Sequence, residues 1–339
     1  MTARLSDIAT QAGVSEATVS RVMNGKAGVS AATRQAVVAA MDVLGYERPP
    51  RLRERSSAGL IGLITPELSN PIFPALAQVI EQVLTSRGYT PVLCTQTPGG
   101  STEDQLTELL VERGVTGIIF VSGLHADSTA DMDRYVKLAG RGVPFVMING
   151  YTEKVSAPFV STDDRAAMRL AVSHLAELGH ERIGLAIGPR RFVPVLRKIE
   201  GFVQHMRTAL PYTAEQAEEF VQHSLFTVEG GQAAASALLD KECTAIVCGS
   251  DLMAFGAIRA ARQRGLSVPS DVSVVGFDDS PLIVFADPPL TTLRQPVEAM
   301  GQAAVNALLE EIGGTPAPHA EFVFMPELVV RGSTAARSR

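Results

Sequence analysis

After the first 59 residues, short apolar runs alternate with longer amphipathic stretches, and this alternation most constrains the fold. LIGLIT (60–65), TPVLCT (90–95) and GIIFVS (117–122) have the length and composition of buried strands, whereas residues 73–88 have a helical pattern. Continuous apolar strands between helices form parallel sheets that are covered on both faces. A second set of such segments begins at residue 165. The sequence therefore predicts two α/β lobes with a cleft between them.

The beginning of the chain has a different pattern, that of three short helices. Ser6 and Ser15 precede two helical segments and suit N-caps, and Gly13 between them suits the positive φ of a tight turn. Ala9 allows the two helices to approach closely, and Val19 is expected to face inward. This spacing is typical of a helix-turn-helix, in which the second helix enters the major groove of DNA.

Charge is distributed unevenly along the chain, whose formal net charge is -6. Residues 1–58 contain eight Lys and Arg against five Asp and Glu, whereas the remainder contains 22 against 31. Attraction to phosphates acts locally, because screening at physiological salt limits it to roughly 8 Å. A basic head on an acidic body is therefore compatible with DNA binding.

The same features divide the chain into parts. The stretch ERPPRLRERSSAG is rich in Arg, Pro and Ser, which cannot form a core and is typical of a linker. We expect a helix-turn-helix head at 1–46, a basic hinge at 47–59, a two-lobed ligand-binding and dimerisation domain at 60–333 and a flexible tail at 334–339.

The stretches DIATQAGVSEATVSRVMNG (7–25) and VSAATRQAVVAAMDVLGY (29–46) resemble the head of the lactose/galactose-repressor (LacI/GalR) family. The body motifs LGHERIGL, VPSDVSVVGFDDSPL and DPPLTTLRQP extend the resemblance to about Ser333. TPELSNPIFPALAQVI and RKIEGF are similar to segments of actinobacterial maltose regulators such as those of Streptomyces. The resemblance implies a periplasmic-binding-protein-like body whose chain crosses between the lobes three times.

The resemblance implies that Arg21 reads a guanine and that Glu16 and Ala17 occupy positions that vary with the operator sequence. Arg suits a bidentate contact with guanine O6 and N7, and Glu can accept a hydrogen bond from cytosine N4. Glu16 has an alternative role, which is to favour the N-terminus of its own helix. The full set of expected DNA contacts is Ser6, Ser15, Glu16, Ala17, Thr18, Ser20, Arg21, Asn24, Tyr46, Arg51 and Leu52.

In the family the connector folds into a hinge helix, and a Leu from each subunit wedges into the minor groove, which kinks DNA. Here the usual Ala-Arg-x-Leu is missing, and Leu52 is the only candidate wedge. The alternative is a plain basic tether in which Arg51, Arg53 and Arg55 contact phosphates.

Polar side chains follow several predicted strands, at the edge where parallel sheets bind ligands. Amides, hydroxyls and carboxylates beside an aromatic ring suit a neutral sugar. The resemblance implies effector contacts from the loop at 69–73 and from Asn149, Ser250 and Asp278. The expected set is Ser69, Asn70, Phe73, Asn149, Arg197, Lys198, Ser250 and Asp278.

Three of these assignments have alternatives. Phe73 is either a stacking face for the sugar or a core residue. The family usually places a clamping Arg where this chain has Lys198, and Lys is a point donor, so the clamp is shared between Lys198 and Arg197. Asp251, which follows Ser250, is interpreted mainly as a cap of the next helix.

Other classes of protein are disfavoured. Nucleotide-binding glycine motifs and a GxSxG elbow are missing from the sequence, and the histidines lack metal spacing, so we expect no metal or cofactor. Ser122, His125 and Asp127 are close in sequence, but catalytic triads are assembled from distant segments. The first residues contain no apolar signal run and no stretch approaches 18 apolar residues, which predicts a cytoplasmic protein without a membrane partner.

The sequence therefore predicts a non-enzymatic DNA-binding transcriptional regulator, a repressor of carbohydrate-utilisation genes. A homodimer would bind a pseudo-palindromic double-stranded operator and release it when a neutral polyhydroxylated ligand binds. The resemblance to the maltose regulators implies that this ligand is maltose or a maltodextrin. The alternative is a sugar-binding or sugar-processing protein with an accessory DNA-binding head.

Overall fold

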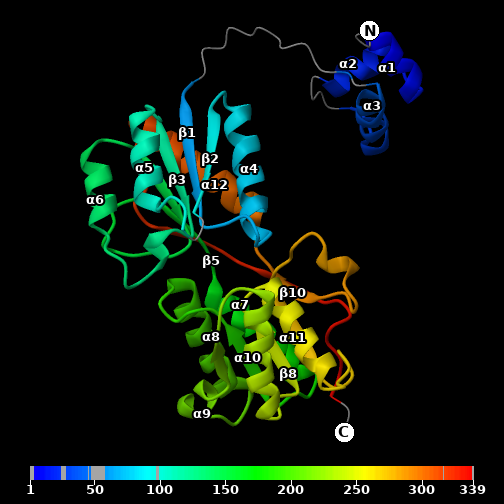
Figure 1. Cartoon of the computed structure of the whole chain (residues 1–339), viewed down its shortest axis with the longest axis vertical. Helices are drawn as coiled ribbons and strands as arrows, with labels where there is room; N and C mark the ends of the chain where they lie inside the picture. Colours follow the sequence, from blue (N-terminus) through cyan, green and yellow to red (C-terminus); the bar gives the residue numbers. More distant parts are fainter. Residues whose placement is uncertain are drawn as a thin grey trace. The chain divides into compact units, whose positions relative to one another are not determined.

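The computed structural model describes residues 4–23, 28–44, 46, 58–96, 99–315 and 317–337 (Figure 1). Contacts group the chain into two compact units, Met1–Ser56 and Ser57–Arg339. The first unit is helical, and the second consists of two α/β lobes. The predicted fold class, a helix-turn-helix followed by a two-lobed α/β domain with parallel sheets, is confirmed.

The helical unit contains α1 (Leu5–Ala12), α2 (Glu16–Met23) and α3 (Ala31–Val43). Ile8, Val19 and Val37 are fully buried and form its small core, one from each helix. Val19 thus faces inward as its spacing predicted. Gly13 has φ 64°, the left-handed conformation that the turn between α1 and α2 requires.

Of the two N-caps predicted for α1 and α2, Ser15 is confirmed and Ser6 is not. The Ser15 hydroxyl accepts a hydrogen bond from the Thr18 amide at 3.2 Å, as an N-cap does. Ser6, in contrast, lies inside α1, because the helix begins one residue before it and Arg4 is the N-cap. Asp7 then accepts from the Arg4 amide at 2.7 Å, so the N-cap prediction for Ser6 is wrong.

The first lobe is built on a sheet of strand order β11-β5-β4-β3-β1-β2, in which neighbouring strands are parallel. Its central strands carry Ile61, Ile118 and Val146 without exposed surface, as expected for strands covered on both faces. The elements of this lobe are β1 (Leu60–Thr65), α4 (Ile72–Ser86), β2 (Thr90–Thr95), α5 (Glu103–Glu112), β3 (Gly117–Val121), η1 (Leu124–Ala126), α6 (Asp133–Gly140), β4 (Phe145–Ile148), β5 (Phe159–Thr162), α12 (Val297–Ile312) and β11 (Glu321–Phe324).

The second lobe is built on a sheet of order β12-β10-β9-β8-β6-β7, parallel except for the antiparallel edge strand β12. Its core includes the large buried side chains of Phe202, Ile246 and Leu293. The elements of this lobe are α7 (Asp164–Glu177), β6 (Ile183–Ile187), α8 (Val193–Ala209), α9 (Ala214–Glu218), β7 (Val221–His223), α10 (Val228–Asp240), β8 (Ala245–Cys248), α11 (Asp251–Gln263), β9 (Ser273–Asp278), η2 (Ile283–Phe285), β10 (Thr291–Arg294) and β12 (Glu327–Val329).

The described chain passes between the lobes at three places: between β5 and α7, between β10 and α12, and between β11 and β12 (Figure 1). The last two crossings lie within the segments TTLRQP and FVFMPELVV, as the resemblance implied. Because these crossings lie side by side, the lobes share one hinge and face each other across a cleft.

The segment after Ser333 differs from the prediction of a flexible tail. The Ala335 amide donates to the Ser273 hydroxyl at 3.1 Å, and the Arg337 amide donates to the Leu178 carbonyl at 2.9 Å. His180, which is buried, contacts the Ala335 carbonyl at 3.1 Å. The prediction is therefore corrected for residues 334–337, which dock on the second lobe because backbone groups and a buried histidine there need partners.

Candidate functional site

The first candidate surface lies on α2 of the helical unit. Ser15, Glu16, Ala17 and Arg21 are exposed on it, while Val19 on the opposite side is buried. A short helix with this division buries one face and exposes the other, which is the arrangement of a helix that enters a DNA groove. The side chains expected to read bases are thus all on the exposed face.

The remaining expected DNA contacts are placed differently. Thr18 and Ser20 are partly buried, and Tyr46 packs against the core of the helical unit. The Ser15 hydroxyl is engaged as a helix cap, and Ser6 is a residue of α1. Asn24, Arg51 and Leu52 lie outside the described residues, so their expected roles stay predictions.

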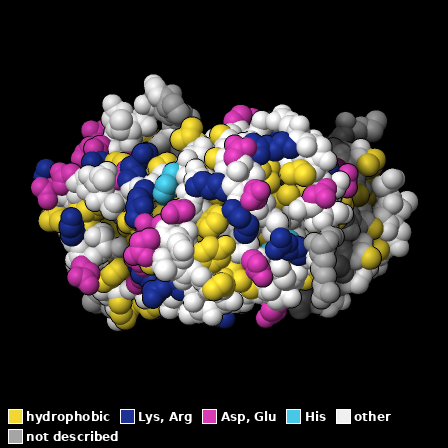
Figure 2. Space-filling view, turned by 90° about the horizontal axis from the view of Figure 1, so that it is seen from below, with side chains coloured by type: hydrophobic (Ala, Val, Ile, Leu, Met, Phe, Trp, Pro, Cys, Tyr) yellow, Lys and Arg dark blue, Asp and Glu magenta, His cyan; other side chains and the backbone are white. Residues whose placement is uncertain are grey.

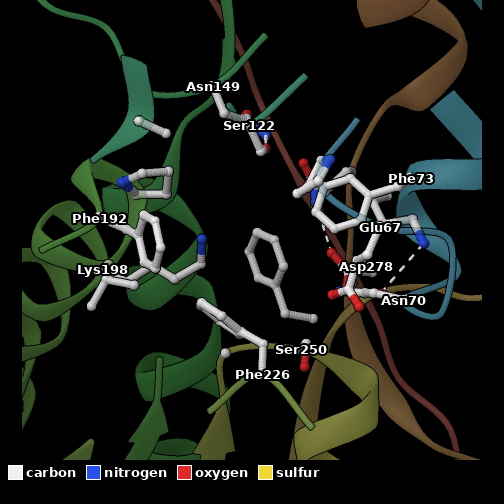
Figure 3. Close-up of a pocket in the computed structure, with 18 residues that line it drawn as sticks. Glu67, Asn70, Phe73, Ser122, Asn149, Phe192, Lys198, Phe226, Ser250 and Asp278 are labelled. Carbon is white, nitrogen blue, oxygen red and sulfur yellow. Dashed lines mark hydrogen bonds between the residues drawn. The ribbon is translucent and has the colours of Figure 1, made fainter. Parts of the chain in front are cut away.

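The second candidate site is a cavity of about 230 Å³ between the lobes. Its lining comes from the carboxyl ends of strands in both sheets and from the loops and helix starts that follow them, where open parallel sheets bind ligands. Asn70 follows β1 and Asn149 follows β4 in the first lobe, whereas Ser250 and Asp278 belong to the ends of β8 and β9 in the second. Figure 3 shows these side chains around one space.

Three lining residues other than glycine have positive φ: Ser122 (45°), Asn149 (66°) and Asp278 (119°). Such conformations are uncommon for residues with a side chain and cluster at functional sites, where the surrounding fold imposes them. The Asn149 amide donates to the Ser122 hydroxyl at 2.9 Å. The strand ends are therefore bent to present polar groups to the cavity.

Asp278 is tied to the hinge. Gln295, at the second crossing, donates from Nε2 to Asp278 Oδ1 at 2.7 Å, and Thr162, at the first crossing, donates to Gln295 Oε1 at 2.7 Å. All three are buried. Two chain crossings and one cavity-lining carboxylate thus form a single hydrogen-bonded network, so a ligand bound to Asp278 would lie one hydrogen bond away from the hinge residue Gln295.

The two residues that shared the predicted clamp have separate roles. Lys198 lines the cavity, pairs with Asp164 and lies 4.0 Å from the centroid of the Phe277 ring. Arg197 instead forms a bidentate pair with Glu321, at 2.5 and 3.0 Å. Because neighbouring residues of a helix point in different directions, only one can face the cleft. The structure therefore places Lys198 at the cavity and Arg197 at a pair between the lobes.

Two predictions concern the loop after β1. Asn70 and Phe73 line the cavity. Phe73 also packs against the core of the first lobe, so its ring is both a cavity wall and a core residue. Ser69 is exposed and donates to Glu67. Ser69 is outside the cavity lining, whereas Glu67, which the sequence reading did not select, belongs to it.

Aromatic rings from the second lobe form a part of the cavity that the sequence reading missed. Phe192, Phe226 and Phe277 line it together with Phe73 of the first lobe (Figure 3). Phe226 fits because Gly188 and Gly249 lack side chains; a Cβ at Gly188 would lie 2.1 Å from this ring. Phenylalanines in loops and strands also serve as core residues, so only the fold could identify these as cavity walls.

The N-cap of α11 is Ser250, whereas the sequence pattern assigned this role mainly to Asp251. The Ser250 hydroxyl accepts from the Met253 amide at 3.2 Å and is the N-cap of α11. Asp251 is buried and accepts from the Ser280 amide at 2.7 Å and from the Thr292 hydroxyl at 2.6 Å. The interpretation of Asp251 as the cap is wrong, because its carboxylate instead joins the loop at Ser280 to strand β10 at Thr292.

Burial controls the acidity of the carboxyl groups around the cavity. Burial raises the pKa of Asp251 to about 6, and burial together with the nearby Asp251 charge raises the pKa of Asp278 well above its ordinary value. Burial also raises the pKa of Asp164, although its partner Lys198 opposes this shift. A polar ligand that donates hydrogen bonds would stabilise the charged forms.

Ser122, His125 and Asp127 have three separate environments. Ser122 contacts Asn149, His125 is fully buried against the Ile148 carbonyl, and Asp127 pairs with an arginine of the other lobe. Within the described residues, no group of three or more His, Cys, Asp or Glu could hold a metal ion. No helix in the described part of the chain is long and apolar enough to cross a membrane.

Comparison with known proteins identifies both units. Residues 4–49 match the family described as bacterial regulatory proteins, lacI family, and residues 172–334 match the periplasmic binding protein-like domain. The chain is 74% identical over 337 residues to the HTH-type transcriptional regulator MalR of Streptomyces coelicolor, covering 99% of this chain and 98% of the relative. It is 33% identical over 339 residues to the HTH-type transcriptional repressor CytR of Escherichia coli, covering 98% and 97%.

Solved structures support the same assignment. The complex of the transcriptional regulator CelR with cellobiose has 32% sequence identity and a TM-score of 0.72, covering 98% of this chain and 99% of that one. The lac repressor dimer bound to operator and an anti-inducer has 27% identity and a TM-score of 0.69, covering 99% and 100%. With a helix-turn-helix head, a two-lobed body and relatives of this similarity, the chain belongs to the LacI family of bacterial DNA-binding transcriptional regulators.

Proposed function

We propose that this regulator is a dimeric repressor of carbohydrate-utilisation genes and that maltose or a maltodextrin, bound in the cavity between the lobes, releases it from its operator. The observation that carries the proposal is the cavity itself, which combines amide, carboxylate and ammonium groups with four phenylalanine rings. This chemistry lies in a chain whose first unit is a DNA-binding head.

The lining suits a neutral polyhydroxylated ligand. Sugar rings have apolar C–H faces, which can be buried against Phe73 and Phe192, and hydroxyls at their edges. Asn70, Asn149 and Asp278 supply the matching hydrogen-bonding groups. A few polar groups in a largely aromatic cavity are typical of small-molecule sites.

The relatives favour a glucose-containing oligosaccharide. The name MalR of the Streptomyces coelicolor relative points to maltose, and the CelR structure contains cellobiose, another disaccharide. At 74% identity over nearly the whole chain, we infer the same class of effector for this protein.

Dimerisation is supported by an apolar surface on the second lobe. Leu282 and Phe285 around η2 are 75% and 83% exposed, and Val284 between them is 43% exposed. Neighbouring exposed apolar side chains mark interaction sites. Since DNA palindromes are bound by two-fold symmetric dimers, we infer that this surface pairs with a second copy.

The face of the molecule drawn in Figure 2 has both signs of charge, with Lys and Arg interspersed among Asp and Glu. DNA attracts a protein through a surface of predominantly positive charge. We therefore assign operator binding to the head and its basic connector, and effector binding to the cleft.

The effector acts by preferring one arrangement of the lobes. A ligand can shift such an equilibrium only by its differential affinity for the two forms. Asp278 lines the cavity and is hydrogen-bonded to Gln295 at the hinge. Binding at Asp278 therefore couples occupancy of the cavity to the angle between the lobes.

A gel-shift assay with DNA from upstream of the protein's own gene tests this proposal. We expect a specific complex that maltose or a maltodextrin dissociates and that galactose and ribose leave intact. Arg21→Ala should weaken the complex about 10- to 100-fold, because a bidentate contact to guanine contributes roughly 1–3 kcal/mol. Arg207→Ala, an exposed arginine on α8, is the matched control and should have no effect. A complex that persists at saturating maltodextrin, or forms only with it, would contradict the proposed repression.

A further inference from the structure

The loops that follow β3 and β6 join the two lobes on the side of the cavity occupied by Phe192. The Ser128 amide and hydroxyl both donate to the Arg191 carbonyl, at 2.8 and 2.7 Å, and Arg191 Nε lies 2.8 Å from Asp127 Oδ2. Asp127 and Phe192 also form an antiparallel bridge. We call Asp127, Ser128 and Arg191 the latch.

The latch is preorganised on both sides. Asp127 uses its other oxygen to accept from the Thr129 amide at 2.9 Å and from the Thr129 hydroxyl at 2.6 Å. The Arg191 guanidinium lies 4.7 Å from the centroid of the Phe192 ring. Because each partner is held within its own loop, little side-chain freedom is lost when the loops meet.

The latch forms the outer layer of the cavity wall. Ala126, directly before it in the first lobe, and Phe192, directly after Arg191 in the second, both line the cavity. On the outer side, the Arg191 side chain is 51% exposed to solvent, whereas Asp127 is 13% exposed. One layer of side chains therefore separates the cavity from solvent here.

The opposite side of the cavity is bounded by the hinge. Figure 3 shows Phe192 and Lys198 on one side, and Asn70, Phe73 and Asp278 on the other. Asp278 is bonded to Gln295 at a chain crossing, so that side cannot open without breaking the hinge network. The latch side is the one that the protein can open with loop contacts alone.

We propose that Asp127, Ser128 and Arg191 determine the length of the oligosaccharide that the cleft accepts, by closing the cavity at Phe192. This inference rests on the proposed maltodextrin effector and deepens it. A short glucan fits between the hinge and the latch, whereas each further glucose unit in the direction of Phe192 must displace the latch. The affinity of the protein should therefore decrease with glucan length.

Calorimetric titration of the full-length protein with maltose, maltotriose, maltotetraose and maltohexaose tests the inference. In the native protein we expect the shorter sugars to bind more tightly than maltohexaose. In the double variant Asp127→Ala/Arg191→Ala, the affinity for maltohexaose relative to maltose should increase about tenfold, equivalent to about 1.4 kcal/mol. Arg190→Ala is the matched control, because this neighbouring arginine pairs with Glu218 of the same lobe at 3.5 Å.

Exchanging the charges of Asp127 and Arg191 tests whether the ion pair, and not only the size of the two side chains, sets the length preference. Asp127→Arg and Arg191→Asp should each relax the length preference, and their combination should restore it because the ion pair is rebuilt. If the native protein binds the sugars but the ratio of affinities is the same in the double alanine variant, the latch inference is refuted and the effector stands. If the native protein binds none of the four sugars, the maltodextrin effector and the latch are refuted together.

Discussion

The candidate DNA-binding surface and the cavity between the lobes are assembled in opposite ways. On α2, the expected contacts Glu16, Ala17 and Arg21 lie within six residues of one another and are exposed. In the cleft, the lining residues come from positions 66 to 295 and several, such as Asp278, are buried. The first surface is local in sequence, and the second exists only because two sheets place their strand ends face to face.

The two regions also differ in what supports them. The helical unit depends on a core of only a few buried side chains, among them Ile8, Val19 and Val37, whereas each lobe of the body has a larger core. A small unit buries a smaller fraction of its surface and is correspondingly marginal. Removing one buried side chain should therefore unfold the helical unit, whereas an equivalent substitution in the core of the body should only reduce its stability.

The largest effect is expected from Ile8→Ala. Removing this buried side chain should cost about 2–5 kcal/mol and unfold the head, because that loss exceeds what so small a core can spare. Operator binding should be lost while calorimetry shows sugar binding unchanged. Ile246→Ala in β8, which is equally buried, is the matched control and should lower the melting temperature of the body without abolishing either activity. Loss of both activities in Ile8→Ala would show that the units do not fold independently.

A smaller effect is expected when a buried polar contact in the cleft is changed. Asp278→Asn should weaken maltose binding by about 10- to 100-fold, because it replaces a carboxyl oxygen that can accept from a sugar hydroxyl by an NH2 group, and a buried group left without its hydrogen-bond partner costs roughly 1–3 kcal/mol. Operator binding without sugar should stay unchanged, which gel shifts at increasing maltose concentration would show as a displaced release curve. Asp240→Asn replaces an exposed acid paired with Arg264 and should leave both affinities as they are. Equal loss of DNA binding in Asp278→Asn would contradict the separation of the two sites.

The smallest effect is expected at the ion pair between the lobes. Glu321→Gln removes the charge that faces Arg197, and since both side chains are only 14–16% exposed, the free energy of unfolding of the body should decrease by about 1–2 kcal/mol. Glu200→Gln, in the pair with Arg165 that is more than half exposed, should change it by about 0.5 kcal/mol or less. Urea denaturation followed by circular dichroism measures both. Equal effects in the two variants would show that the pair between the lobes does not contribute more than a surface pair.

Much of the fold could be predicted because its signals are periodic and local. The strand predicted at 60–65 coincides with β1, and the one at 90–95 coincides with β2, since apolar runs bounded by turn residues define both ends. Apart from the tail at 334–337, which docks on the second lobe, the errors concern single side chains. Ser6 and Asp251 were interpreted as caps from their position before a helix, but a cap is decided by which backbone amide a side chain actually reaches.

The candidate site was only partly predictable. Asn149 and Asp278 follow apolar strands directly, so their place at the sheet edge could be inferred, and both line the cavity. Phe192, Phe226 and Glu67 could not be selected, because a phenylalanine or an acid in a loop has no local signature of the cavity it faces.

The sequence by itself determined the helix-turn-helix surface, the order of strands and helices and the family, because these depend on neighbours within a few residues or on continuous motifs. Only the tertiary structure decided that Lys198 faces the cavity while Arg197 pairs with Glu321, and that Asp127 meets Arg191 across the cleft. The partners in these two pairs are 64 and 124 residues apart. Which of the adjacent Arg197 and Lys198 meets a partner depends on the angle at which helix α8 packs rather than on its sequence alone.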